Sequence, residues 1–204
     1  MITIVDYGLG NVQAIANIYK RLNIPVTRAA TAHELDGTQK MILPGVGAFD
    51  WAMSRLEASG MRGRLDELVL EERRPVLGIC VGMQMLGYGS DEGELDGLGW
   101  IEGNVRRFDE ASFTGATHLP HMGWNDVKPV PATLLFAGLE QDALFYFLHS
   151  YYFAPRNEAD MLAVTDYGGT FACSVARDNV YGVQFHPEKS HQWGVRLLKN
   201  FAEM

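Results

Sequence analysis

Cysteine is scarce in this sequence, since the 204 residues include only Cys80 and Cys173. Two cysteines are too few for a disulfide framework, and the chain opens on an apolar segment at Ile2 without a basic leader, so we expect a cytoplasmic protein. No apolar run approaches the roughly 18 residues that are needed to cross a bilayer. Long hydrophobic runs are therefore absent, and a membrane-spanning role is excluded.

Positive charge is also in short supply. The chain has 17 Lys and Arg against 25 Asp and Glu, which gives a formal net charge of -8. Such a chain offers no basic field to nucleic acid or to an anionic membrane. A small neutral or zwitterionic ligand fits this composition better.

The order of apolar segments predicts the fold class. Hydrophobic residues make up 47% of the chain, which suits one domain over residues 1–204. In the first half, short strand-like segments alternate with segments of helical spacing; the strand-like ones lie at 2–6, 25–27, 41–43 and 76–79. This alternation predicts an α/β domain with a mostly parallel central sheet and helices on both faces.

The C-terminal half has a different pattern. It contains β-prone segments joined by glycine pairs and Asp-Asn hairpin signals, at 144–153, 161–167, 172–177 and 180–185. We expect them to add antiparallel strands to the sheet. A closing helix is expected from about Ser190, as its N-cap, to Phe201.

One nine-residue stretch carries the strongest chemical signal. It reads Val76-Leu77-Gly78-Ile79-Cys80-Val81-Gly82-Met83-Gln84, a buried strand that turns into a helix with a cysteine at the bend. This is the spacing of a nucleophile elbow, with cysteine in place of serine. A helix N-terminus favours the thiolate, and the N–H of Val81 is placed to serve half of an oxyanion hole. Gln84 lies one turn further on the same side.

A cysteine nucleophile needs a base and a group that orients the base. His186 and Glu188 lie two residues apart on a segment that Pro187 keeps extended, so their side chains leave the same face. Glu188 can accept the Nδ1–H of His186, which leaves Nε2 to exchange a proton with Cys80. Alone, His-Pro-Glu is more often a surface turn, but an elbow cysteine on a parallel sheet reverses that preference.

The loop Pro44-Gly45-Val46-Gly47 follows the third expected strand. Its glycines permit a backbone N–H to turn inward as a second oxyanion donor, if the sheet places the loop beside the elbow. An ordinary strand-to-helix turn explains the same residues equally well.

Two further motifs are too incomplete to predict a dinucleotide site or a metal site. Gly8-x-Gly10 follows the first strand, but Gln13 replaces the third glycine of a dinucleotide site. His118-x-x-His121 lacks further ligands for a metal, and its aromatic surroundings favour a protein contact in a loop over 117–125.

Together these motifs resemble a known family. The segments around Cys80, His186 and Val46 are similar to the signatures of the class I glutamine amidotransferases. Three further segments resemble the branch formed by the glutaminase subunits of imidazole glycerol phosphate synthase: Pro120-His121-Met122-Gly123-Trp124-Asn125, Phe147-Leu148-His149-Ser150-Tyr151 and His186-Pro187-Glu188-Lys189-Ser190. The similarity spans nearly the whole chain.

The resemblance implies a flavodoxin-like, single-domain glutaminase that needs no cofactor or metal. Cys80, His186 and Glu188 would be the catalytic triad, and Val46, Gly47 and Val81 the oxyanion hole. Gln84, Glu92, Ser150 and Tyr151 match the positions that bind glutamine. The partner would be a (βα)₈-barrel cyclase in a heterodimer, which receives ammonia for histidine biosynthesis, and the matching interface positions are Asn11, His121, Met122, Trp124, Asn125 and Lys189.

Three alternatives remain open at this point. The chain could be the glutaminase of another pathway, such as anthranilate or pyridoxal phosphate synthesis. It could be a regulatory relative that only binds a partner, although the intact Cys80, His186 and Glu188 count against this. A peptidase is a third alternative, which Gln84 and Glu92 disfavour because they suit a free amino acid.

Overall fold

A computed structural model describes residues 1–113 and 117–204 of the protein. In these residues the central sheet has eight strands in the order β2-β1-β3-β4-β12-β11-β10-β7. In that order the strands are Val26–Ala29, Ile2–Val5, Lys40–Gly45, Val76–Cys80, Val180–Val183, Thr170–Arg177, Met161–Asp166 and Lys128–Pro129.

The sheet combines a parallel and an antiparallel half. Strands β2, β1, β3, β4 and β12 are parallel to one another, while β11, β10 and β7 are paired antiparallel. The predicted α/β sheet with added antiparallel strands is therefore confirmed. One detail differs, because β12 is antiparallel to β11 but parallel to β4. The Asp178-Asn179 turn fixes the first pairing, whereas nothing local in the sequence fixes the second.

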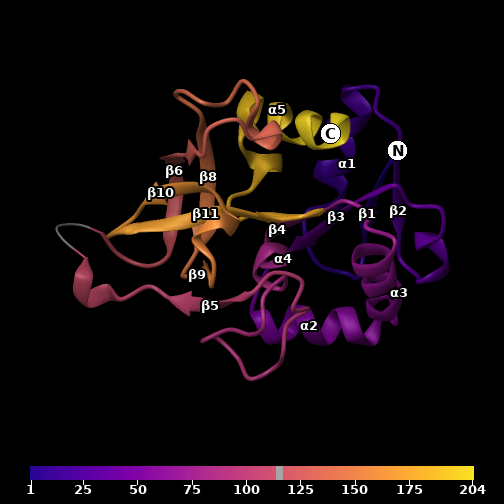
Figure 1. Ribbon diagram of the computed structural model, residues 1–204, viewed down its shortest axis with the longest axis horizontal. Coiled ribbons are helices and arrows are strands. Elements are labelled where there is room, and N and C mark those ends of the chain that lie inside the picture. The colour runs from indigo at the N-terminus through magenta and orange to yellow at the C-terminus, as the bar shows by residue number, and fades with distance from the viewer. Residues whose placement is uncertain (114–116) are drawn as a thin grey trace.

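Helices cover both faces of the sheet. The α-helices are α1 Val12–Arg21, α2 Phe49–Ala58, α3 Arg62–Asp66, α4 Val81–Gln84 and α5 His191–Glu203. Figure 1 shows α1 and α5 on one side of the sheet and α2, α3 and α4 on the other. Tyr19 of α1 donates a hydrogen bond to the carbonyl of Leu198 in α5 (3.0 Å), which ties the first pair together. None of the described helices is long and apolar enough to cross a membrane.

Shorter helical turns fill the connections. A π-helical turn over Glu67–Glu71 extends α3, and 3₁₀ turns occupy His33–Leu35, Glu110–Ser112, Leu134–Phe136, Glu158–Asp160 and Pro187–Lys189.

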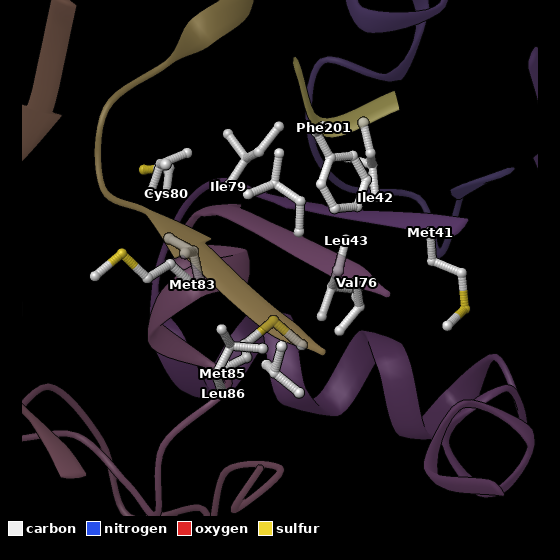
Figure 2. Close-up of a cluster of buried hydrophobic side chains, with 14 of the residues drawn as sticks. Met41, Ile42, Leu43, Val76, Ile79, Cys80, Met83, Met85, Leu86 and Phe201 are labelled. Atoms are coloured by element: carbon white, nitrogen blue, oxygen red, sulfur yellow. The ribbon is translucent and has the colours of Figure 1, made fainter. Parts of the chain in front are cut away.

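The central strands are buried on both faces, as the continuous apolar runs of the sequence predict. Side chains of β3 and β4 alternate between the two faces. In Figure 2, Ile42 and Ile79 lie beside Phe201 of α5, whereas Met85 and Leu86, just beyond α4, lie on the opposite face. The core thus holds β4 between two layers of helix, and the end of β4 at Cys80 is fixed from both sides.

Two small sheets stand beside the central one. Gly103–Arg107 (β5) pairs with Tyr151–Pro155 (β9), and His121–Asp126 (β6) pairs with Leu144–His149 (β8), both antiparallel. The expectation of a loop over 117–125 is therefore wrong for residues 121–125, which form most of β6. Glycine and proline in this segment indicate a turn, but the paired residues of its partner strand β8 lie 18 to 28 residues further along the chain and supply the backbone hydrogen bonds.

Candidate active site

Cys80 stands at the end of β4 in a strained backbone conformation. Its φ of 56° and ψ of -114° lie in a region that residues with side chains rarely adopt. This is the geometry of a nucleophile elbow, because the sharp turn presents the side chain between strand and helix. The predicted strand-to-helix bend is present, although α4 is only four residues long.

The glycines around Cys80 allow backbone segments to come very close. A Cβ on Gly82 would lie 1.9 Å from the carbonyl oxygen of Leu43, and a Cβ on Gly78 would lie 2.6 Å from the carbonyl oxygen of Gly82. No side chain fits at either position. The elbow therefore packs directly against β3, and Gly45 is the register partner of Cys80. The sheet does place the 44–47 loop beside the elbow.

His186 follows β12, the strand next to β4, so it reaches the same edge of the sheet as Cys80. Its Nδ1 lies 2.9 Å from Oε1 of Glu188, and both side chains are almost fully buried. Its backbone N–H donates to the carbonyl of Tyr146 (2.9 Å). The sequence-based pairing of His186 with Glu188 is thus present in the structure.

The electrostatic setting of His186 favours its charged form. Burial disfavours an imidazolium, but the hydrogen bonds of the ring to Cys80 and Glu188 outweigh burial and raise the pKa of His186 above its ordinary value. Because Nδ1 is bound to Glu188, Nε2 is the nitrogen left for Cys80. The ring is therefore placed to hold a proton beside the sulfur.

Ser190 occupies the N-cap position of α5, as expected, but its side chain makes no capping hydrogen bond to the helix. Its hydroxyl donates to the carbonyl of His186 (2.6 Å) and accepts from the N–H of Tyr146 (3.0 Å). Because Tyr146 lies on β8, 44 residues away, this use of Ser190 has no local sequence signal. The consequence is that Ser190 anchors the His186 segment to β8.

A cavity of about 310 Å³ opens at the C-terminal edge of the parallel strands. It brings together all predicted catalytic, oxyanion and substrate residues except Glu188, together with Lys189: Val46, Gly47, Cys80, Val81, Gln84, Glu92, Ser150, Tyr151, His186 and Lys189. Glu188 lies behind His186. This edge is where ligands bind in open α/β sheets.

The predicted substrate residues have defined partners. The amide nitrogen of Gln84 donates to the carbonyl of Tyr151 (3.1 Å) and to Oε1 of Gln184 (3.1 Å). Glu92 accepts from the N–H of Phe49 (2.8 Å), at the first residue of α2. One carboxylate oxygen of Glu92, Oε2, thus anchors its loop to the start of α2.

The predicted interface residues separate into two groups. Met122 and Trp124 are 62% and 45% exposed, and Asn11 and Lys189 are exposed as well. His121 is only 3% exposed, and Asn125 is half-buried. The strand alternation of β6 explains this division. The ring of His121 therefore points into the protein, away from any direct contact at the surface.

Sequence reasoning missed three residues of the site region. The hydroxyl of Tyr7 donates to the carbonyl of Pro44 (2.7 Å) and so anchors the loop over 44–47. Nε2 of Gln184 lies 3.8 Å from Sγ of Cys80. His149 lines the cavity and donates to the carbonyl of Tyr151 (2.7 Å). For Gln184, the available signal was its position two residues before His186 in the strand expected over 180–185.

Comparisons with known proteins show the family of this chain. Residues 3–204 match the model of the family described as glutamine amidotransferase class-I. The chain is 62% identical to the imidazole glycerol phosphate synthase subunit HisH of Bdellovibrio bacteriovorus and 48% identical to that of Leptospira interrogans, over 204 residues and 100% of both chains in each case.

Solved structures show the same fold. A crystal structure of a glutamine amidotransferase superposes with a TM-score of 0.74 at 19% identity, over 100% of this chain and 99% of that one. A structure of PurLQS from Thermotoga maritima gives a TM-score of 0.70 at 17% identity, over 99% of this chain and 97% of that one.

The chain belongs to the class I glutamine amidotransferase family. Its full-length identity to the curated relatives places it, within that family, among the HisH subunits of imidazole glycerol phosphate synthase.

Proposed function

We propose that this protein hydrolyses glutamine to glutamate and ammonia with Cys80 as the nucleophile. It is then the glutaminase subunit of imidazole glycerol phosphate synthase, an enzyme of histidine biosynthesis, as its HisH relatives are named. The single observation that carries the assignment of residues is the joint placement of a strained Cys80 and a His186–Glu188 pair at one cavity.

The reaction proceeds in two halves. The proton of the Cys80 thiol passes to Nε2 of His186, and the sulfur forms a bond with the side-chain amide carbon of glutamine. His186 then donates that proton to the amide nitrogen, the C–N bond breaks, and ammonia leaves a thioester on Cys80. Water adds to the thioester while His186 takes its proton, the C–S bond breaks, and glutamate leaves with Cys80 restored. Glu188 orients the imidazole throughout.

The oxyanion that forms in each half needs two donors. We assign one to the N–H of Val81, which follows Cys80, and one to the Val46–Gly47 peptide at the cavity wall. Gly47 has a φ of 87°, a conformation that glycine adopts freely, so this peptide can rotate to turn an N–H inward. Tyr7 holds the Pro44 carbonyl and confines such a rotation to the residues that follow it.

The free oxygens of Gln84 and Glu92 are the groups proposed to bind the glutamine head group. The carboxylate of Glu92 suits the ammonium group, and the backbone of Ser150 and Tyr151 completes the site. Both lone pairs of the Tyr151 carbonyl are engaged by Gln84 and His149, so its N–H is the group left for substrate.

The partner implied by the HisH relatives is a cyclase subunit. We propose that it is a (βα)₈ barrel, bound as a heterodimer in the cytoplasm, which receives ammonia from Cys80. The exposed side chains that support this docking face lie on β6 and β8, namely Met122, Trp124, Leu144 and Leu148, and Leu148 also lines the cavity. Exposed Asn11 and Lys189 belong to the same proposed surface.

A glutaminase assay with Cys80→Ala tests the proposal. Wild-type protein with the cyclase and its nucleotide ligand should release glutamate, and the variant should release none while still binding the cyclase. Cys173→Ala is the control, because Cys173 is fully buried in β11 and should leave the activity intact. Glutamate release by Cys80→Ala at the wild-type rate would refute the assignment.

A further inference from the structure

A row of hydrogen bonds connects β6 to the wall of the cavity. Nδ2 of Asn125 lies 3.3 Å from Nε2 of His121, and Nδ1 of His121 lies 3.1 Å from Nε2 of His149. Nδ1 of His149 lies 2.7 Å from the carbonyl oxygen of Tyr151. Both histidines are buried, at 3% and 7% exposure, so these contacts replace water.

The direction of each bond in this row follows from its last member. A carbonyl oxygen only accepts, so Nδ1 of His149 carries the proton. Burial lowers the pKa of His149 to about 3, so the ring is neutral and its Nε2 is an acceptor. His121 therefore donates from Nδ1 and accepts at Nε2 from the Asn125 amide. The second hydrogen of that amide goes to the carbonyl of Asp166 (2.8 Å), so the row has one consistent arrangement.

The Tyr151 carbonyl joins this row to the nucleophile. It also accepts from Gln84, whose other amide hydrogen goes to Gln184. The amide nitrogen of Gln184 lies 3.8 Å from Sγ of Cys80. His149 and Gln84 both donate to the Tyr151 carbonyl and together fix its position, because moving the carbonyl toward either donor lengthens its hydrogen bond to the other.

Packing alone does not account for the two imidazoles. His121 is stacked between Phe147 and Tyr167, with ring centroids 4.5 and 3.9 Å away, and His149 packs against Phe108 and Phe171. A phenylalanine would fill such aromatic surroundings without the cost of burying polar nitrogens. What a phenylalanine cannot do is donate to Tyr151.

We propose that His149, held in one tautomer by His121 and Asn125, is a positioning residue for glutamine hydrolysis that fixes the Tyr151 carbonyl and, through it, the Gln84 amide at the substrate cavity. This inference rests on the proposed glutaminase function. It concerns the binding of the glutamine head group, and it leaves the reactivity of the sulfur to His186 and Glu188.

Three substitutions of His149 distinguish the role of Nδ1 from the role of Nε2. His149→Asn keeps a donor where Nδ1 stands and loses the acceptor for His121. His149→Gln keeps an acceptor near the place of Nε2 and loses the donor to Tyr151. His149→Phe keeps the volume and loses both. His33→Phe is the control, because the side chain of His33 is 95% exposed.

In complex with the cyclase subunit, kcat/KM for glutamine should fall about tenfold in His149→Gln and His149→Phe, mainly through KM, and less than threefold in His149→Asn. Labelling of Cys80 by a glutamine chloroketone should slow in the same order. Alkylation by iodoacetamide, which needs no head-group site, should stay within twofold of wild type in all three. A role in folding alone would not produce this split.

Equal losses in His149→Asn and His149→Phe would overturn the proposal, and so would a parallel fall in the iodoacetamide rate. Wild-type activity that disappears in Cys80→Ala confirms the proposed function whatever the His149 variants show. Wild-type protein that binds the cyclase but releases no glutamate refutes the function itself, so the two failures are distinguishable.

Discussion

Glu188 holds His186 with one carboxylate oxygen, Oε1, while its Oε2 is buried and has no hydrogen-bond partner among the described residues. The negative charge of Glu188 is therefore directed at a single neighbour, the imidazole. That charge is one of the causes that raise the pKa of His186. The charge and the shape of Glu188 can be separated by replacing the carboxylate with an amide.

Glu188→Gln should lower kcat for glutamine by about 100-fold, the lower range of general acid–base contributions. The amide still accepts from Nδ1, but it no longer stabilises the imidazolium, so the alkaline limb of the pH profile should move to lower pH. Steady-state kinetics from pH 6 to 10 measure both effects. Glu203→Gln, the same change at an exposed position near the end of α5, should match wild type. An unshifted alkaline limb would argue against the orienting role.

His149 should make the fold sensitive to acid. Burial first, and then the charges of His121 and His186, lower its pKa from 6.5 to about 3. Below pH 6.5 the unfolded chain therefore binds a proton that the folded protein does not, so stability falls as pH decreases toward 3, and above pH 6.5 this group contributes no pH dependence. Urea unfolding at pH 7.5 and pH 5.0 should show a difference that is smaller in His149→Phe by about 2 kcal/mol. An unchanged difference, like that expected for His33→Phe, would contradict this reasoning.

The sequence predicted that Cys80, His186 and Glu188 lie together because each of them is part of a short motif. Cys80 is flanked by two glycines, and His186 and Glu188 are two residues apart, so local geometry was enough to pair them. It did not predict the contact of His121 with His149, because the two are 28 residues apart and meet only when β6 and β8 pair. A single sequence does not distinguish a histidine in an exposed polar loop from a buried histidine.

At the scale of elements, backbone atoms are closely packed at the junction of β3, β4 and α4. The Cβ of an alanine at Gly82 would lie 1.9 Å from the carbonyl oxygen of Leu43 in β3. Backbone atoms on both sides must move to admit it, and they include the elbow itself. Figure 2 shows this region, with Cys80 and Met83 next to the strands.

Gly82→Ala should therefore lower the free energy of unfolding by about 3 kcal/mol, which is the upper range for overpacking a core. Gly63→Ala is the matched control: Gly63 lies in α3 with no atom within 4 Å of an added Cβ. Alanine there should keep or raise stability by up to about 1 kcal/mol, because it favours helix. Urea unfolding compares the two, and equal stabilities would mean that the elbow relaxes without cost.

The elements that were predicted correctly are those whose signals are local. Strands β1, β3 and β4 are short apolar runs that are each followed by a turn containing glycine, and the hairpin between β11 and β12 has its own turn residues. By contrast, the aromatic run over 144–153 was predicted as part of the central sheet, and it divides instead into β8 and β9, which pair with β6 and β5. Its β propensity was evident, but the choice of partner strand depends on chain segments far away.

At the scale of the whole molecule, β6 and β8 form a separate two-stranded sheet that lies beside the antiparallel end of the central sheet (Figure 1). One of its faces packs inward through Phe145 and Phe147, which are fully buried. The other presents Met122, Trp124, Leu144 and Leu148 to solvent. A two-stranded sheet with one apolar face uncovered is the arrangement expected of a surface that a partner completes.

Trp124→Ala should weaken binding of the cyclase subunit by about 30-fold, because tryptophans at the centre of an interface commonly contribute about 2 kcal/mol. The indole of Trp124 stacks on His191 at 5.1 Å, so it is held in place before binding. Leu134→Ala is the control: Leu134 is 68% exposed, but it lies with Met204 and Tyr181 in a separate pocket that shares no residue with the active-site cavity. Titration calorimetry with the cyclase measures both. If Trp124→Ala bound as tightly as Leu134→Ala, the docking face would have to lie elsewhere than on β6 and β8.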